Sequence, residues 1–178
     1  MISSTPATAA LHWEMRTTPI VFVNVGDPVA SGLVARLDRP SGNVTGFANL
    51  EASMGGKWLE LLSEIASGLK RAAIMFNPDT TPTVSTYMPS FETAARSLKV
   101  ALITAPVHSD VEIETAITAL GREPGSGLVV IPDAFTSRHR APIISAAARH
   151  NVPAVYSEIY YARAAKAATT TIPIVFGH

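Results

Sequence analysis

The chain has 178 residues, of which 47% are hydrophobic, and its 14 Lys and Arg balance 14 Asp and Glu. A formal net charge of zero gives no reason to expect nucleic acid or an anionic membrane as partner, because both attract an excess of basic residues. The absence of Cys excludes a thiol nucleophile, a disulfide framework and a cysteine metal site.

The first sixteen residues, MISSTPATAALHWEMR, have neither the basic start nor the apolar run of a secretory signal peptide. No stretch approaches 18 consecutive apolar residues, so we expect no transmembrane helix. For a chain expressed as printed, these features predict a cytoplasmic location.

The first half of the chain is predicted to contain two strands and two helices. Pro19–Val25 is a β-branched run typical of a strand buried on both faces. Ser31–Asn43 is predicted as a short helix that ends near Pro40, and Asn43–Phe47 as a short strand or connector. Gly55–Lys70 follows as an amphipathic helix, because one apolar face is formed by Trp58, Leu61, Leu62 and Ile65 and Gly68 is a natural stop.

Strands and helices alternate regularly from residue 71 onward. Four strands are predicted, over Arg71–Asn77, Val100–Val107, Gly127–Asp133 and Val152–Ser157. The segments between them read as helices, one opening on a capping-box pattern at Ser109 and Glu112 and one carrying Pro142 in its first turn; Pro89 is expected to start or kink a third. This alternation predicts an α/β fold in which parallel sheets are flanked by helices.

Candidate ligand-binding residues follow the predicted strands, because parallel sheets bind ligands beyond the carboxyl ends of their strands. These candidates are Asp27, Asn77, Asp79, Thr81, Asp133 and Tyr156. The carboxylates could accept hydrogen bonds from an amine or hydroxyl, the loop after Asn77 could hold a carboxylate, and Tyr156 could stack on a flat ligand. The alternatives are that the polar residues cap helices and that Tyr156 packs at an edge.

No motif indicates catalysis, a metal or a cofactor. The five His residues lack the spacing of a zinc site, and the chain has no G-x-S-x-G nucleophile elbow. The glycine-rich stretch Gly121–Gly127 precedes a strand instead of following one, so it cannot cradle a phosphate as a P-loop does. We therefore expect a protein without enzymatic activity, metal or cofactor.

Four motifs, GDPVASGLV, GNVTG, GGKWLELL and FNPD, occur together and in this order. With them, the stretch from Thr17 to Ala162 resembles the substrate-binding protein family of ABC transporters. The resemblance implies a type I periplasmic binding protein fold, in which two α/β lobes close on a small solute. It also implies periplasmic delivery of that solute to an ABC permease, and some members resemble carriers of tryptophan or other aromatic amino acids.

The chain departs from this family in its organisation, because family members are nearly twice as long. The resemblance implies an unmatched segment over 1–16, a remnant of the first lobe with the hinge helix over 17–68, and the second α/β lobe over 69–160. The tail, 161–178, repeats the PIVF of Pro19–Phe22 at Pro173–Phe176. We expect a truncated or rearranged member whose remnant exposes apolar surface and sheet edges and self-associates. The tail strand Ile172–Phe176 is expected to pair beside Pro19–Val25.

Two other functions remain open. A non-functional fragment without a native ligand would explain the missing part of the first lobe. A small flavodoxin-like or Rossmann-class enzyme would use Asp27 and Asp133 as acid and base, which requires both carboxylates to face one pocket. The resemblance places the two on different lobes, which argues against the enzyme.

Overall fold

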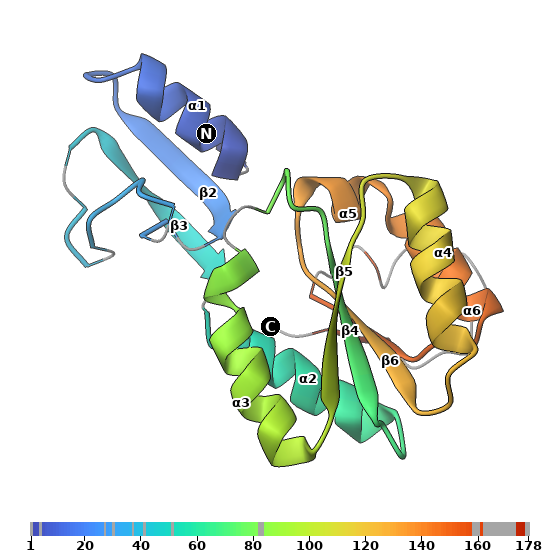
Figure 1. The fold of residues 1–178 in the computed structure, drawn as a ribbon. Helices are drawn as coiled ribbons and strands as arrows, with labels where there is room; N and C mark the ends of the chain where they lie inside the picture. Colours follow the sequence, from blue (N-terminus) through green and yellow to red (C-terminus); the bar gives the residue numbers. More distant parts are fainter. Residues whose placement is uncertain are drawn as a thin grey trace. The chain divides into compact units, whose positions relative to one another are not determined.

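A computed structural model of the chain describes residues 2–3, 5–26, 28–29, 31–36, 38–40, 42–50, 52–81, 84–157, 161 and 174–176 (Figure 1). The chain divides into two compact units. Unit 1 comprises Met1–Met54 and Thr83–Tyr87, and unit 2 comprises Gly55–Pro82 and Met88–His178. The boundary at Met54 places the helix after it in unit 2, whereas the sequence grouped that helix with the region before residue 69.

Unit 1 is built on a three-stranded parallel sheet with the order β1-β2-β3. Its elements are β1 (Ile2–Ser3), α1 (Thr5–Glu14), β2 (Ile20–Gly26) and β3 (Val44–Leu50), followed later by the 3-10 helix η1 (Val84–Thr86). The predicted strands at β2 and β3 are confirmed, whereas β1 and α1 were not predicted. The side chain of Asn43 donates hydrogen bonds to the carbonyl oxygens of Met15 (2.6 Å) and Thr18 (2.7 Å), which fixes the chain where it enters β2.

Among the described residues of unit 1, one face of this sheet carries a core. Ile20, Phe22 and Val25 of β2 pack with Val44 of β3, with Leu33 and Val34 of the connecting segment, and with Ala9 and Leu11 of α1. The alternate side chains point to the other face, where Val21 is 42% exposed and Phe47, which pairs with Val23, is 75% exposed. Unit 1 therefore combines a small core with an apolar face open to solvent.

The helix predicted over Ser31–Asn43 is wrong, because the described residues between 28 and 43 form turns and bends. Gly32 adopts a φ of +68°, a left-handed conformation that interrupts a right-handed helix. The backbone N–H groups of Leu33 (2.9 Å) and Val34 (3.2 Å) both donate to the carbonyl oxygen of Pro28. This turn buries two consecutive apolar side chains in the core, which a helix would point in different directions.

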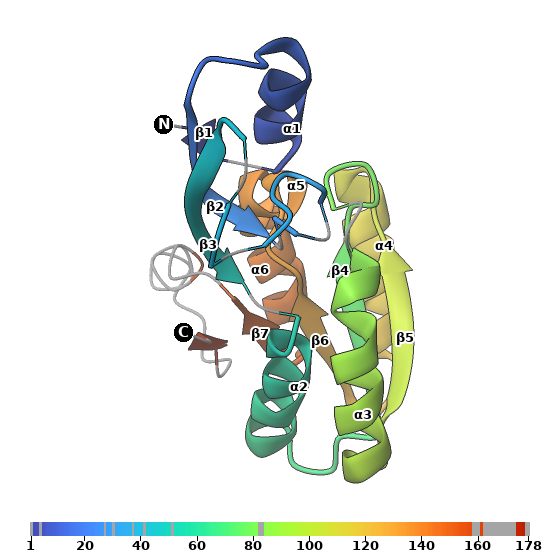
Figure 2. The ribbon, with the colours of Figure 1, turned by 90° about the vertical axis from the view of Figure 1, so that its left-hand side faces the viewer.

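Unit 2 contains a five-stranded parallel sheet with the order β5-β4-β6-β7-β8. Its elements are α2 (Met54–Ile65), β4 (Arg71–Phe76), α3 (Met88–Leu98), β5 (Ala101–Pro106), α4 (Asp110–Gly121), β6 (Ser126–Val130), α5 (Ala134–Arg138), α6 (Arg140–Arg149), β7 (Ala154–Tyr156) and β8 (Ile174–Phe176). The helices α2 and α3 cover one face of the sheet, and α4 and α6 cover the other (Figures 1 and 2). The central strands β4 and β6 are consequently buried along almost their whole length.

The helices of unit 2 begin and end largely where the sequence predicts. Gly68 follows α2 with a φ of +79°, as expected of a helix stop. Pro89 and Pro142 lie in the first turns of α3 and α6, where a missing N–H does no harm. The buried side of α2 is rotated from the predicted stripe, because Leu59 is fully buried while Leu61 is half-buried. The short helix α5 was not predicted.

The tail strand β8 pairs in parallel with β7, with Ile174 opposite Ala154 and Phe176 opposite Tyr156. The expectation that this strand pairs beside Pro19–Val25 is wrong. The reason is edge availability, since β2 already lies between β1 and β3 and offers no free edge. The strand β7 has β6 on one side only, so its other side accepts β8. No helix in the described ranges is long and apolar enough to cross a membrane.

Candidate functional site

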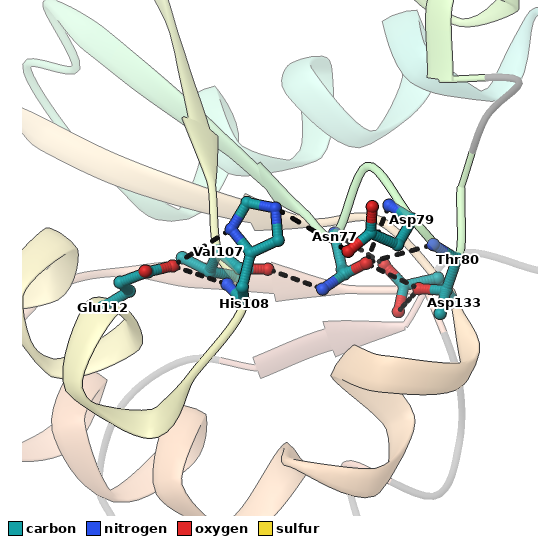
Figure 3. A network of polar contacts seen from close by, with 7 residues as sticks. All are labelled: Asn77, Asp79, Thr80, Val107, His108, Glu112 and Asp133. Carbon is teal, nitrogen blue, oxygen red and sulfur yellow. Dashed lines mark hydrogen bonds and ion pairs between the residues drawn. The ribbon is translucent and has the colours of Figure 1, made fainter.

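The carboxyl ends of β4, β5 and β6 meet at one edge of the unit 2 sheet, where polar side chains form a connected network (Figure 3). Ligands of parallel α/β sheets bind at such an edge. Four of the sequence-predicted site residues lie in the loops at this edge: Asn77, Asp79 and Thr81 after β4, and Asp133 after β6. The structure thus brings these four onto neighbouring loops.

Asn77 is buried and organises the loop that follows β4. Its side-chain Nδ2 donates to the carbonyl oxygen of Val107 at 2.9 Å, which ties this loop to the end of β5. Its Oδ1 accepts the backbone N–H groups of Asp79 (2.9 Å) and Thr80 (3.0 Å), the arrangement of an Asx turn. The amide of Asn77 is therefore engaged at both ends and holds the loop in a fixed shape.

Asp133 connects the end of β6 to the same loop. Its Oδ1 accepts from the backbone N–H of Thr136 (2.7 Å) and from the hydroxyl of Thr80 (3.1 Å), and its Oδ2 accepts the N–H of Asn77 (3.1 Å). The hydroxyl of Thr136 in turn accepts the N–H of Asp133, which completes a capping box at the start of α5. As placed here, the Asp133 carboxylate caps a helix and bridges two loops.

Asp79 and Thr81 differ from these two residues in having uncommitted side-chain atoms. The Asp79 side chain is 79% exposed, and its Oδ2 lies 3.9 Å from Nε2 of His108. Thr81 is buried, yet its hydroxyl has no hydrogen-bond partner in the described part of the chain. A buried hydroxyl without a partner costs free energy, roughly 1–3 kcal/mol, which a bound polar group would recover.

His108 and Glu112 belong to the same network, although sequence reasoning did not assign them to the site. The Glu112 carboxylate accepts the backbone N–H of His108 at 2.6 Å and lies 3.2 Å from its Nδ1. The first of these contacts, followed by the imidazole, holds the pKa of Glu112 below its ordinary value. The predicted capping box is half present, because Ser109 accepts from the N–H of Glu112 while the Glu112 side chain turns to His108.

The remaining predicted site residues lie elsewhere. Tyr156 is buried within the core of unit 2, where its ring stacks on Tyr161 with centroids 4.6 Å apart, and burial raises the pKa of its hydroxyl. Asp27 lies outside the described residues, so its predicted role stays a prediction. Among the residues that the structure describes, no group of three or more His, Asp or Glu could hold a metal ion.

Comparison with known proteins identifies the family to which the sequence is similar. The sequence model of the family described as ABC transporter substrate binding protein matches residues 2–174. The match begins at residue 2 and so includes residues 2–16, for which no resemblance was predicted. A tyrosine-binding protein of Clostridioides difficile is 26% identical over 156 residues, which make up 87% of this chain and 44% of that protein.

Two solved structures share the fold. A conserved domain protein of Vibrio cholerae superposes with a TM-score of 0.78 at 27% identity, over 90% of this chain and 53% of that one. A domain of Streptococcus pneumoniae in complex with L-Trp superposes with a TM-score of 0.77 at 21% identity, over 90% of this chain and 54% of that one. The chain therefore spans about half the length of the relatives it matches, and the predicted α/β fold with parallel sheets is confirmed over that half.

Proposed function

The chain belongs to the ABC transporter substrate-binding protein family, and we propose that it supplies one wall of the solute site of such a protein. Members of this family bind a solute without converting it, which leaves no role for Asp27 and Asp133 as an acid–base pair. Delivery of the solute to an ABC permease outside the cytoplasm is likewise a proposal, since the chain spans about half of its relatives.

The observation that carries this proposal is the loop Asn77–Thr81. Hydrogen bonds fix its backbone, because the Asp133 carboxylate accepts from the Asn77 N–H and the Asn77 amide bonds to Val107 and Asp79, while the Asp79 carboxylate projects into solvent. A site held rigid before binding loses little conformational entropy when the ligand arrives. In this proposal Asn77 and Asp133 position the loop, and Asp79 and Thr81 contact the solute.

We further propose that the solute is an amino acid with a flat side chain. The ammonium group of an amino acid would donate charge-assisted hydrogen bonds to the Asp79 carboxylate, and these are stronger than bonds between neutral groups. The tyrosine-binding protein that shares 26% identity with this chain supports an aromatic amino acid. Tyr156 has its ring packed on Tyr161, so the proposed contact does not depend on it.

A thermal-shift titration of the full chain with L-tyrosine, L-tryptophan and L-alanine tests this function. A ligand that binds the folded state raises the unfolding midpoint by mass action, so the aromatic amino acids should raise it in a saturable manner. Asp79→Asn should weaken binding about tenfold, because it removes a charged acceptor. Glu92→Gln, on the exposed surface of α3, is the matched control and should bind as the unchanged protein does.

A fragment without a ligand of its own is the second candidate. The exposed apolar face of unit 1 at Val21 and Phe47 favours it, because a substrate-binding protein normally covers such a face. If none of a panel of amino acids and small organic acids moves the unfolding midpoint, this second candidate replaces the first.

A further inference from the structure

The helix α6 has a histidine at each end, and both histidines reach across to α4. His139 precedes the first residue of α6 and His150 follows the last. Nδ1 of His139 lies 2.6 Å from Oδ1 of Asp110, and Nε2 of His150 lies 3.0 Å from Oε1 of Glu114. The two carboxylates are four residues apart and hence lie on one face of α4, so the pairs act together at a single helix–helix contact.

His139 is held in place by more than its carboxylate partner. Its ring stacks on Phe135 with centroids 4.1 Å apart, and its backbone N–H donates to the carbonyl oxygen of Phe135 at 2.9 Å. The side chain is 27% exposed, so water screens its pairing with Asp110 only in part. The neighbouring cation Arg140 donates to the carbonyl oxygen of Ser137, which leaves Asp110 to the imidazole.

His150 contacts three residues of α4. Its Nε2 lies 3.0 Å from the hydroxyl of Thr118 as well as from Glu114. A Cβ atom at Gly121 would come within 2.8 Å of His150, so only glycine lets the end of α4 approach this closely.

The acidic residues of α4 face basic side chains from neighbouring elements, namely Arg149 and three histidines. The hydrogen bond from His150, and then the charge of Arg149, hold the pKa of Glu114 below its ordinary value. Glu112 pairs with His108, which itself lies near the Asp79 carboxylate. Each of the three acidic residues in the first half of α4 thus has a histidine partner from outside the helix.

We propose that the α4–α6 contact is a pH-responsive clamp, in which two imidazole–carboxylate pairs hold the helices together most tightly when each imidazole is protonated and each carboxylate is not. An imidazole without the extra proton makes only a neutral hydrogen bond to its carboxylate, and the contact is then weaker. A carboxylate that takes up a proton loses the ion pair in the same way. The α4 helix directly follows the loop of His108, so the clamp steadies one side of the candidate site. This inference does not require that a solute binds.

Thermal unfolding of the full chain at pH 5.5 and pH 8.5 tests the clamp. The double variant His139→Gln, His150→Gln should lose roughly 2–4 °C of midpoint at pH 5.5 and much less at pH 8.5, so its midpoint depends less on pH than that of the unchanged protein. His12→Gln in α1 of unit 1 is the control and should keep the original pH dependence. Equal pH dependence in the double variant and the unchanged protein overturns the proposal.

Hydrogen exchange on the unchanged protein gives a second test that does not depend on the variant folding. After correction for the intrinsic effect of pH on exchange, protection of α4 amides should fall between pH 5.5 and pH 8.5 more than that of β4 amides. The strand β4 lies at the centre of the sheet and carries no histidine, so it reports the stability of the unit as a whole. Parallel changes in α4 and β4 would contradict a local clamp.

Discussion

Each unit contains a parallel sheet packed against helices, yet the units differ in how many layers cover their sheets. In unit 2, α2 and α3 lie on one face and α4 and α6 on the other, and the strand residues Ala72–Met75 are buried. In unit 1, α1 and the segment around Leu33 cover one face, while Phe47 stays exposed on the other. Parallel sheets are normally covered on both faces; within the described part of the chain the central strands of unit 2 follow this rule, whereas its edge strand β5 and one face of the unit 1 sheet stay exposed.

The two copies of the PIVF sequence also differ in their surroundings. Both copies begin a strand at the isoleucine after proline, at Ile20 and at Ile174. The first copy lies between two neighbouring strands, whereas the second occupies the edge of another sheet. Local sequence therefore determines that a strand forms, and the free edges of the folded units determine where it pairs.

The largest expected effect comes from the core of unit 2. Trp58 in α2 is fully buried and packs near Phe91 of α3, with ring centroids 6.2 Å apart. Trp58→Ala should lower the free energy of unfolding by about 3–5 kcal/mol, because it removes a large side chain and leaves a cavity. Trp13→Ala is the matched control in unit 1, where the ring is exposed, and should cost less than about 0.5 kcal/mol. Urea denaturation measures both, and similar losses would remove the distinction between the units.

The next effect concerns the network at the candidate site. Asn77→Ala removes the side-chain partner of the Val107 carbonyl and of the Asp79 N–H, and it leaves the Thr80 N–H only its 3.3 Å bond to the backbone carbonyl of residue 77. We expect a loss of about 1–3 kcal/mol in the free energy of unfolding. Exchange of the Asp79 and Thr80 amides should also accelerate, as measured by NMR. Unchanged stability would mean that water replaces the amide and that the loop is not held as described.

A smaller thermodynamic effect is expected on the open face of unit 1. We propose that this face drives self-association, and Phe47→Thr places a β-branched residue, which favours a strand, in β3 while removing most of the exposed apolar surface. The free energy of unfolding should change by less than about 0.5 kcal/mol, while the mass from light scattering should shift toward the monomer. A chain that is already a monomer before the substitution contradicts this proposal.

The smallest effect is a pH dependence at Glu112. Its folded-state pKa is lowered by the His108 N–H, so its contribution to stability is present above the ordinary glutamate pKa and is lost as pH falls through the folded value. Glu112→Gln should therefore flatten the fall of the unfolding midpoint in the acidic range below about pH 4.3. Acid titration followed by circular dichroism measures this slope, and an unchanged slope would show that the contact does not persist in solution.

Most of unit 2 was predictable because its elements follow local periodicity. The apolar runs at β4 to β7 and the apolar stripes of α3 and α4 lie within short stretches of sequence. The segment around Leu33 could not be predicted from local sequence, because its conformation depends on packing against β2 and on the backbone of Gly32. The short helix α5 depends on a capping box too brief to show a period.

The site could be predicted only as a location. Asn77, Asp79, Thr81 and Asp133 were predicted from the rule that ligands bind at strand carboxyl ends, and they do lie at one edge of the sheet; their contact with a ligand stays a prediction. The rule could not show that Asn77 and Asp133, 56 residues apart, bond to each other, because that depends on the order of strands in the sheet. His108 was not predicted as a site residue, because the spacing of the histidines fits no metal site. Its partners are instead carboxylates from a loop and a helix.

Hydrogen exchange across the whole chain tests most directly the claim that the central strands of unit 2 are covered on both faces and the unit 1 sheet on one. Slow exchange should concentrate in β4 and β6, which are covered on both faces, because their amides open only when the unit unfolds. The amides of β2 and β3 should exchange faster by at least about tenfold, since one uncovered face lowers the cost of opening that sheet. Equal protection of the two sheets would contradict the claim.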